Sequence, residues 1–500
     1  MTSLEEIAAR DVLRFVAVAL LPTIFLWALA TAVYRRYLHP LSKVPGPFVG
    51  SISEFYYFYW QYIRHGSLYL QFERLSEKYG PVVRIGPNEV FLSDPENYDK
   101  IYTAHTKFYK DPNMYSRGGG PTSIFSTIPN ETHRKYRSVL NPFFSRRAML
   151  EREGLVQEKA LKVCRDLTKH RQQNVPTNVH DAFRAVSMDA VTEYTLGPDN
   201  CWDFLDKEDY GNWYGNLTRA ISPMIYLFRL LPPLTKMRDL PPWLAEARKV
   251  VRATVQDINA GIRPKVITLF HTILSPDNPN GPASINHMAD EAWAITAAAS
   301  ETTGNALTVI TYKVLKDAAV YARLHDELKE AFPNPDDMTY TELEKLPYLN
   351  AVIKEGFRLS YGILHHLPRV IPQGGATFNG YFLPEGTVIG MSSWTMHRLP
   401  DVFPDPDKYD PERWMDPDKA RHLEKYLTTF SKGNRSCIGK YLAYCEVYVT
   451  VGQIFRRFDD LRILDTTDKD MVYEDYFAPC HAVDANVLKL VGSKYFAEQK

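Results

Sequence analysis

The sequence predicts a mainly α-helical fold with a smaller β-rich portion, preceded by one N-terminal transmembrane helix. Three observations predict it. Residues 15–34 form an uncharged apolar run, apolar residues recur three and four positions apart through much of 130–330, and strand-like stretches at 82–94 and 376–394 surround glycine-containing turns. The 500 residues contain no internal repeat and no low-complexity tract. One continuous catalytic body is therefore expected after the membrane segment.

The apolar run, FVAVALLPTIFLWALATAVY, has about the 20 residues that a helix needs to cross a bilayer. Acidic residues offset the basic ones before it, whereas Arg35, Arg36 and Lys43 follow it, so the positive-inside rule places the C-terminal part in the cytosol. A cleaved signal peptide is the alternative, but no A-x-A-like site precedes the basic flank. The predicted segments are a lumenal N-terminus 1–14, a transmembrane signal anchor 15–34, a basic, proline-rich hinge 35–47 and a catalytic domain 48–500.

Composition excludes several classes of protein. The 59 Lys and Arg residues balance 59 Asp and Glu residues, so no overall positive field attracts nucleic acid. A hydrophobic content of 45% is ordinary for a globular chain and excludes wholesale disorder. Five cysteines without a CxxC pair argue against a disulfide scaffold and favour a reducing compartment.

After the hinge, the predicted elements follow in a definite order. VVRIGPNEVFLSD, residues 82–94, has branched and aromatic residues on both sides of a Gly-Pro turn, which predicts a β-hairpin. Segments 150–170 and 246–262 have the apolar spacing of helices. ATFNGYFLPEGTVIGMSSW, residues 376–394, contains short strand-like runs, and KYLAYCEVYVTVGQIFRRF, residues 440–458, predicts a long apolar helix.

The segment FSKGNRSCIG, residues 430–439, carries the most specific chemistry. It places Cys437 just before the predicted helix, where backbone N–H groups favour a thiolate, as a metal ligand must be. Gly433 and Gly439 let the backbone approach a large flat partner. Buried structural roles are expected for the other four cysteines, which are Cys164, Cys201, Cys445 and Cys480.

This segment resembles the haem-binding signature F-x-x-G-x-R-x-C-x-G of the cytochrome P450 family at every defined position. The resemblance implies the cytochrome P450 fold and a bound haem b whose iron takes its axial thiolate from Cys437. It further implies that Phe430 packs against the haem, that Arg435 holds a propionate and that Gly439 belongs to the same cofactor site. Segments 133–147 and 430–448 look most similar to fungal secondary-metabolism members such as the trichodiene oxygenase type.

Other motifs of the family follow in the expected order. Glu355 and Arg358 form an ExxR pair, which with Arg413 would be a structural triad behind the haem. Taken alone, such a pair is usually a solvated surface ion pair. The resemblance assigns further propionate contacts to His133, which replaces the family's usual tryptophan, and to Arg137 and Arg369.

The apolar segment AWAITAAASETTGNALTVI resembles the family's distal helix. The resemblance implies that Glu301 and Thr302 are catalytic and pass protons during oxygen activation. A buried helix whose hydroxyls bond back to its own carbonyls is the alternative. Ala299 stands where the family usually has glycine. The expected substrate pocket includes the apolar run 222–234, and its named residues are Trp293, Ala297, Ala298, Ile363 and Phe477.

The resemblance implies a membrane-anchored monooxygenase that inserts one oxygen atom of O2 into a lipophilic small molecule, by hydroxylation or epoxidation. A terpenoid or polyketide-derived substrate is expected. The sequence contains no flavin or nicotinamide domain, which implies NADPH–cytochrome P450 reductase as electron donor in the endoplasmic reticulum membrane, with cytochrome b5 as a second candidate partner. The alternatives are a haem-thiolate isomerase or dehydratase that needs no reductase, and a non-catalytic haem-binding membrane protein. Adjacent His365 and His366 are expected to be pocket-lining or surface residues.

Overall fold

The computed structural model describes residues 20–116, 120–221, 266–275 and 284–496, together with single residues between 223 and 278. Several predicted segments therefore fall outside the described residues. These are the lumenal segment 1–14, the first five residues of the apolar run, nearly all of 222–234 and most of the helical segment 246–262.

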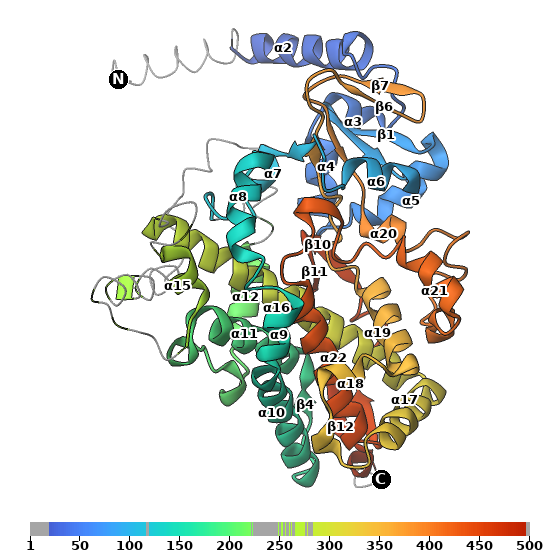
Figure 1. The fold of residues 1–500 in the computed structure, drawn as a ribbon. Coiled ribbons are helices and arrows are strands. Elements are labelled where there is room, and N and C mark those ends of the chain that lie inside the picture. The colour runs from blue at the N-terminus through green and yellow to red at the C-terminus, as the bar shows by residue number, and fades with distance from the viewer. Residues whose placement is uncertain are drawn as a thin grey trace, which may run out of the picture.

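The described chain is mostly helical with smaller sheets, as predicted (Figure 1). The longer helices are α5 (Tyr69–Tyr79), α8 (Asn130–Leu140), α10 (Glu153–Gln172), α11 (Val179–Leu196), α12 (Asn212–Ile221), α16 (Ile285–Lys316), α17 (Ala318–Ala331), α19 (Pro347–Ser360) and α22 (Lys440–Arg457). Shorter helices connect them, namely α3 (Phe48–Ile52), α4 (Phe55–Phe58), α6 (Tyr98–Ile101), α7 (Pro112–Tyr115), α9 (Arg146–Glu151), α15 (Leu269–Leu274), α18 (Tyr340–Leu343), α20 (Ser393–Met396) and α21 (Pro417–Glu424).

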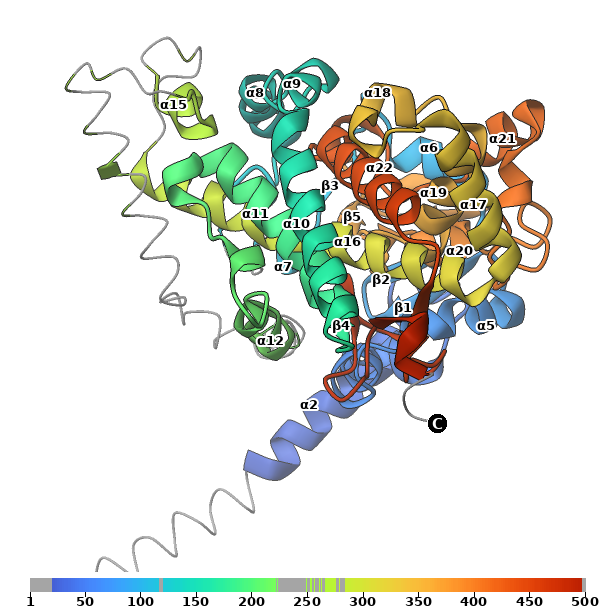
Figure 2. The same ribbon diagram turned by 90° about the horizontal axis from the view of Figure 1, so that it is seen from below.

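The long helix α16 runs through the middle of the body, where α11, α19 and α22 pack around it (Figures 1 and 2). Its N-terminus is capped by Ser284, whose side chain accepts a hydrogen bond from the His287 backbone N–H. Every residue of α11 except Glu193 is buried. A helix that is buried all round belongs to the core, so α11 and α16 together form the centre of the largest hydrophobic cluster.

The main sheet lies beside the N-terminal helices and has the strand order β1-β2-β8-β5-β3. Its predicted hairpin is confirmed, because β1 (Val82–Gly86) pairs antiparallel with β2 (Glu89–Leu92). The remaining strands are β8 (Val388–Gly390), β5 (Arg369–Val370) and β3 (Tyr109–Lys110). The second predicted β region is also confirmed, since it forms the hairpin β6 (Ala376–Phe378) and β7 (Tyr381–Leu383) before β8.

Two further small sheets are formed mostly by strands from the C-terminal part of the chain. One is the hairpin of β10 (Tyr473–Tyr476) and β11 (Ala478–His481), and the other has the order β4-β12-β9. The strands of that second sheet are β4 (Thr177–Asn178), β12 (Lys489–Gly492) and β9 (Leu461–Leu464).

The N-terminal helix α2 (Leu21–Val33) continues as a π-helical turn, Tyr34–Leu38, and projects from the body (Figure 2). No residue of α2 is buried. Among the described residues, no helix is both long enough and apolar enough to cross a membrane. The predicted hinge packs onto the body, because Leu41 and Val44 are buried against Val82 and Val90.

Candidate functional site

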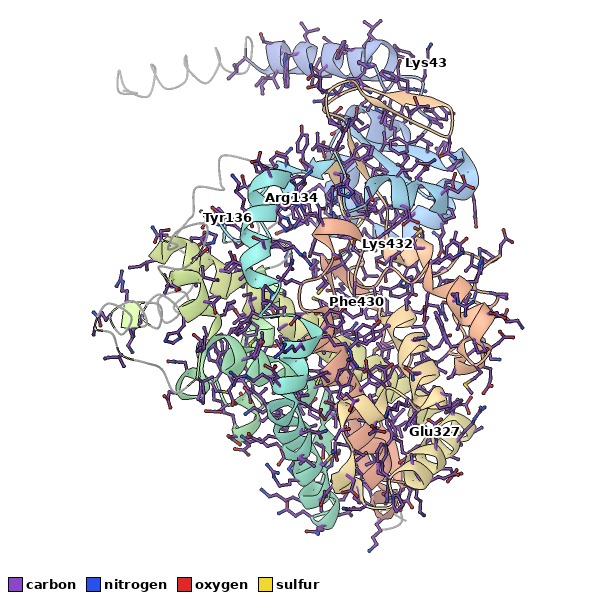
Figure 3. All side chains as sticks on the ribbon, in the orientation of Figure 1. Lys43, Arg134, Tyr136, Glu327, Phe430 and Lys432 are labelled. Carbon is purple, nitrogen blue, oxygen red and sulfur yellow. The ribbon has the colours of Figure 1, made fainter. Side chains whose placement is uncertain are left out.

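The cysteine loop lies between α21 and α22 and is shaped by its own backbone. The Cys437 N–H donates to the Phe430 carbonyl at 2.9 Å, and α22 begins three residues later, with Gly439 as its N-cap. Gly433 has φ +73°, and a side chain there would collide with the Thr103 backbone. Phe430 is labelled in Figure 3. Its ring and those of Phe357 and Tyr444 all pack against one another, with centroids 5.1 to 5.2 Å apart.

Cys437 is exposed to solvent in this structure. A Cβ added at Gly439 would meet only the Cys437 Sγ, at 3.9 Å. The residues around the thiol therefore leave open space beside it. All five cysteines are free, and Cys201 is half-buried where a buried position was expected.

Two opposing effects act on the Cys437 thiol. Burial, the larger one, raises its pKa above the usual range, whereas the Gly439 N–H, Arg137 and Lys440 lower it. The N–H at the start of α22 thus acts in the direction that the sequence predicts, and a positive charge against the sulfur would favour the thiolate further.

Helix α19 supplies a buried acid at the centre of a polar network. Arg358 donates to both oxygens of Glu355, at 2.8 and 2.9 Å, and both side chains are fully buried. The Trp414 indole N–H and the Asp410 backbone N–H donate to the same carboxylate at 2.9 Å each. Arg413 lies 3.4 Å from it. Glu355, Arg358 and Arg413 thus come together as the sequence motifs indicated.

A buried histidine, which no sequence motif singled out, connects this network to the cysteine loop. The His397 Nδ1 lies 2.8 Å from the Arg358 carbonyl, and its Nε2 accepts a hydrogen bond from the Thr428 N–H at 2.8 Å. Burial lowers the pKa of His397 to about 3, so the ring is neutral and can donate at one nitrogen and accept at the other. Thr428 lies two residues before Phe430, where the cysteine loop begins.

The basic residues assigned to propionates gather beside the loop without acidic partners. Arg137 donates to the Ser436 carbonyl at 2.6 Å, Arg435 donates to the Thr127 and Ile128 carbonyls, and Arg369 donates to the Tyr115 hydroxyl at 3.1 Å. No carboxylate of a described residue lies within ion-pair distance of Arg137, Arg369 or Arg435.

The mutual repulsion of these arginines affects the pKa values of the basic groups at the site. Burial, followed by Arg369 and Arg137, lowers the pKa of Arg435 to about 9. His133 is buried, and burial with the surrounding cations lowers its pKa to about 2. Its Nδ1 has no hydrogen-bond partner among the described residues. Arg369 is buried and Arg137 and Arg435 are half-buried, so their positive charge without acidic partners favours the binding of anions here.

On α16, Ala298 and Thr302 are four residues apart and therefore share one face of the helix. Ala298 is exposed and Thr302 is half-buried, although the helix crosses the core. The Thr302 hydroxyl donates back to the Ala298 carbonyl at 2.8 Å. This face of α16 therefore also borders an interior space.

Glu301 points to another side of α16. Its carboxylate forms a buried ion pair with Arg184 of α11 and accepts a hydrogen bond from the Thr218 hydroxyl of α12 at 3.2 Å. Arg184 fits between two glycines, since a Cβ at Gly215 or Gly304 would overlap its side chain. Although burial alone lowers the pKa of Arg184, the Glu301 and Asp181 carboxylates raise it overall.

The expected pocket residues do not all share one surface. Phe477 lies within 6.0 Å of the rings of Tyr115 and Phe125, and together they form an aromatic cluster. Ile363 is a half-buried neighbour of a different hydrophobic cluster, to which Phe477 also belongs. Trp293 and Ala297 are also half-buried, but they lie on the Glu301 side of α16, away from Ala298.

The expectation for His365 and His366 is wrong, because both are fully buried and bonded to acids. His365 bonds to Tyr57 and Asp475, at 2.9 and 3.1 Å, while His366 bonds to Glu89 at 2.6 Å. Their rings do not point to opposite faces, as an extended backbone was expected to place them, because the two ring centroids lie only 4.5 Å apart. Each histidine still connects the segment after α19 to another element.

These features define a mainly helical protein in which an exposed cysteine, Cys437, lies beside a cluster of basic residues. The sequence profile of the family "Cytochrome P450" matches residues 40–478. The chain therefore belongs to the cytochrome P450 family and is an oxidoreductase of that class.

Similar proteins are fungal members of the family. Cytochrome P450 monooxygenase MO6277 of Ascocoryne sarcoides is 32% identical over 94% of this chain and 97% of its own length. Conidiogenone synthase PchP450 of Penicillium rubens is 31% identical over 90% and 94%, respectively. Cytochrome P450 monooxygenase TRI4 of Trichoderma arundinaceum is 32% identical over 88% of both chains.

The family binds haem through a cysteine thiolate, and the residues present fit that group. The accessible Cys437 thiol offers the ligand. The orphaned Nδ1 of His133 and the unpaired arginines fit two propionate carboxylates. In the part of the chain that the structure describes, no other exposed cysteine lies beside arginines that lack an acidic partner.

Changing Glu355 to Gln should destabilise the protein and disturb its cysteine loop. The change leaves the buried Arg358 guanidinium without its charge partner, at a cost of about 3–5 kcal/mol. Thermal denaturation and haem content would measure the loss. Glu424→Gln is the matched control, because it removes a surface ion pair with Lys354 and should cost less than about 1 kcal/mol. Equal effects of the two changes would contradict the structural role of Glu355.

Proposed function

We propose that this protein is a haem-thiolate monooxygenase that inserts one oxygen atom of O2 into a lipophilic small molecule, by hydroxylation or epoxidation. The observation that carries the proposal is the exposed Cys437, which lies beside arginines without acidic partners and beside the buried, unpaired Nδ1 of His133. For hydroxylation the balance is RH + O2 + NADPH + H⁺ → ROH + H2O + NADP⁺. NADPH–cytochrome P450 reductase is the proposed electron donor, with cytochrome b5 as a second candidate.

Each part of the site has a proposed role. Cys437 would hold the iron of haem b, while His133, Arg137, Arg369 and Arg435 would bind its propionates. The haem supplies oxygen activation, which the electron-rich thiolate favours. Ala298 and Thr302 would line the space above it, and Thr302 would hold a proton there. Glu301 would resupply that proton.

A terpenoid or polyketide-derived substrate is proposed. Three similar proteins support this: one is named conidiogenone synthase and two are named cytochrome P450 monooxygenase TRI4. The aromatic cluster of Tyr115, Phe125 and Phe477 supports a lipophilic ligand, since apolar walls are what such a ligand needs.

Carbon monoxide added to the reduced full-length protein in membranes should give a strongly red-shifted Soret band. Reduction with dithionite tests whether the protein contains a thiolate-ligated haem. Reduction with NADPH and NADPH–cytochrome P450 reductase tests whether this reductase is the electron donor. Cys437→Ser should abolish the band, whereas Cys201→Ser should keep it. A folded wild-type protein without haem would overturn the proposed function.

Thr302→Val should uncouple electron consumption from product formation, because the hydroxyl that holds a proton is lost. With a compound that the wild-type enzyme oxidises, product per NADPH should fall roughly tenfold or more and hydrogen peroxide should rise. The carbon monoxide spectrum should stay unchanged. Thr303→Val, at the neighbouring buried position, serves as control. Unchanged coupling in Thr302→Val would exclude the role.

Anchoring in the endoplasmic reticulum membrane through residues 15–34 is also proposed. The exposed apolar side chains of α2, with Phe25 67% and Trp27 70% exposed, support it, as do the basic residues that follow. Deleting residues 1–34 should move the protein from the membrane to the soluble fraction with its haem spectrum intact. A truncated protein that still sediments with membranes would show that another surface holds it there.

A further inference from the structure

Lys110 is a buried cation that no sequence motif indicated. It lies on β3 of the main sheet with 7% of its surface exposed. Its Nζ donates to the Phe125 carbonyl at 2.6 Å and lies 4.3 and 4.4 Å from the ring centroids of Tyr115 and Phe125. No carboxylate of a described residue lies within 4 Å of this ammonium group. Its contacts are neutral, and they use one of its three donors.

The strand register brings Lys110 against another cation. Lys110 pairs directly with Arg369 across β3 and β5. Side chains at paired positions of antiparallel strands are neighbours, and like charges there repel. Both groups also share one ring, since the Arg369 guanidinium bonds to the Tyr115 hydroxyl and lies over the same ring as Lys110. The fold therefore concentrates positive charge at this point.

The charges around Lys110 connect it to the haem side of the site. Burial is the largest cause that lowers the pKa of Lys110 well below its usual range, followed by Arg369, Arg435 and Arg137. Lys110 in turn contributes to the low pKa of His133. These four neighbours are the residues assigned to the propionates. A carboxylate placed among them would relieve the repulsion and restore the ammonium form.

We propose that Lys110 binds a carboxylate of the haem and is a further positioning residue of the cofactor site. The proposal rests on the proposed function, because it requires a haem at Cys437. The ammonium would donate its remaining hydrogen bonds to the propionate nearest Arg369. The aromatic rings of Tyr115 and Phe125 would shield this contact from water, which strengthens it.

The test compares Lys110→Met with Lys107→Met in the full-length holoenzyme. Lys107 is exposed and lies three residues earlier, so it is a matched control. The first readout is the rate of haem transfer to excess apomyoglobin, and we expect it to rise roughly tenfold or more for Lys110→Met only. The second readout is the reduction potential, which should become more negative because a positive charge near the haem is lost.

Lys110→Arg separates charge from packing. It keeps the cation, and we expect it to retain haem better than Lys110→Met, including the case in which the Met variant incorporates little haem. If the Arg variant loses haem as fast as the Met variant, the role of Lys110 is packing and the proposal is overturned. Unchanged haem transfer and potential in Lys110→Met would overturn it as well.

The alternative ligand for Lys110 is a carboxylate of the substrate. Optical titration with dodecanoic acid and with dodecanol distinguishes this alternative from a haem carboxylate. If Lys110→Met weakens binding of the acid alone, while haem transfer and potential stay at wild-type values, Lys110 belongs to the substrate site and the proposal is wrong. A wild-type protein without haem would instead be a failure of the proposed function.

Discussion

The geometry of the cysteine loop depends on one buried carboxylate, that of Glu355. It receives two bonds from Arg358, which also donates to the carbonyls of His397, Pro406 and Lys408. His397 carries the connection to Thr428, two residues before the loop. A buried charge is tolerated only where its hydrogen-bonding capacity is satisfied. Glu355 and its hydrogen-bonding partners hold fixed positions and therefore also fix the segment that carries Cys437. That segment lies about 80 residues after Glu355 in the sequence.

The basic cluster on the other side of the loop is the opposite case. Lys110 and three arginines are held by carbonyls, hydroxyls, an amide oxygen and rings, but by no carboxylate of the described residues, and His133 beside them is neutral. A folded protein does not usually retain such a set, because cations without a counter-charge repel one another and are costly where they are buried. On one side of the Cys437 thiol, the buried carboxylate of Glu355 has its hydrogen-bonding partners. On the other side, the basic residues lack negative partners, which a dianionic cofactor would supply.

The features that local sequence patterns predicted correctly are those that depend on residues close to one another in the sequence. The hairpin at 82–94, the helix after Cys437 and the ExxR pair follow from spacing and turn chemistry within a few positions. Arg184, His397 and Lys110 could not be found in this way, because their roles depend on contacts made between 39 and 117 residues away or across a sheet. Lys107 and Lys110 look alike in sequence, and only the packing of β3 against β5 buries one of them. The histidines at 365 and 366 were misassigned for the same reason.

The position of Glu301 places a physical condition on any proton transfer to Thr302. Successive residues of an α-helix point about 100° apart, so the acid and the hydroxyl do not face the same side. Glu301 is also bound to Arg184, which the glycines at 215 and 304 hold in a narrow slot. A proton that reaches Thr302 through Glu301 must therefore come from a carboxylate that is paired with Arg184 of α11 and that also accepts a hydrogen bond from the Thr218 hydroxyl of α12. Glu301 can therefore transfer a proton only if its carboxylate can leave the ion pair with Arg184.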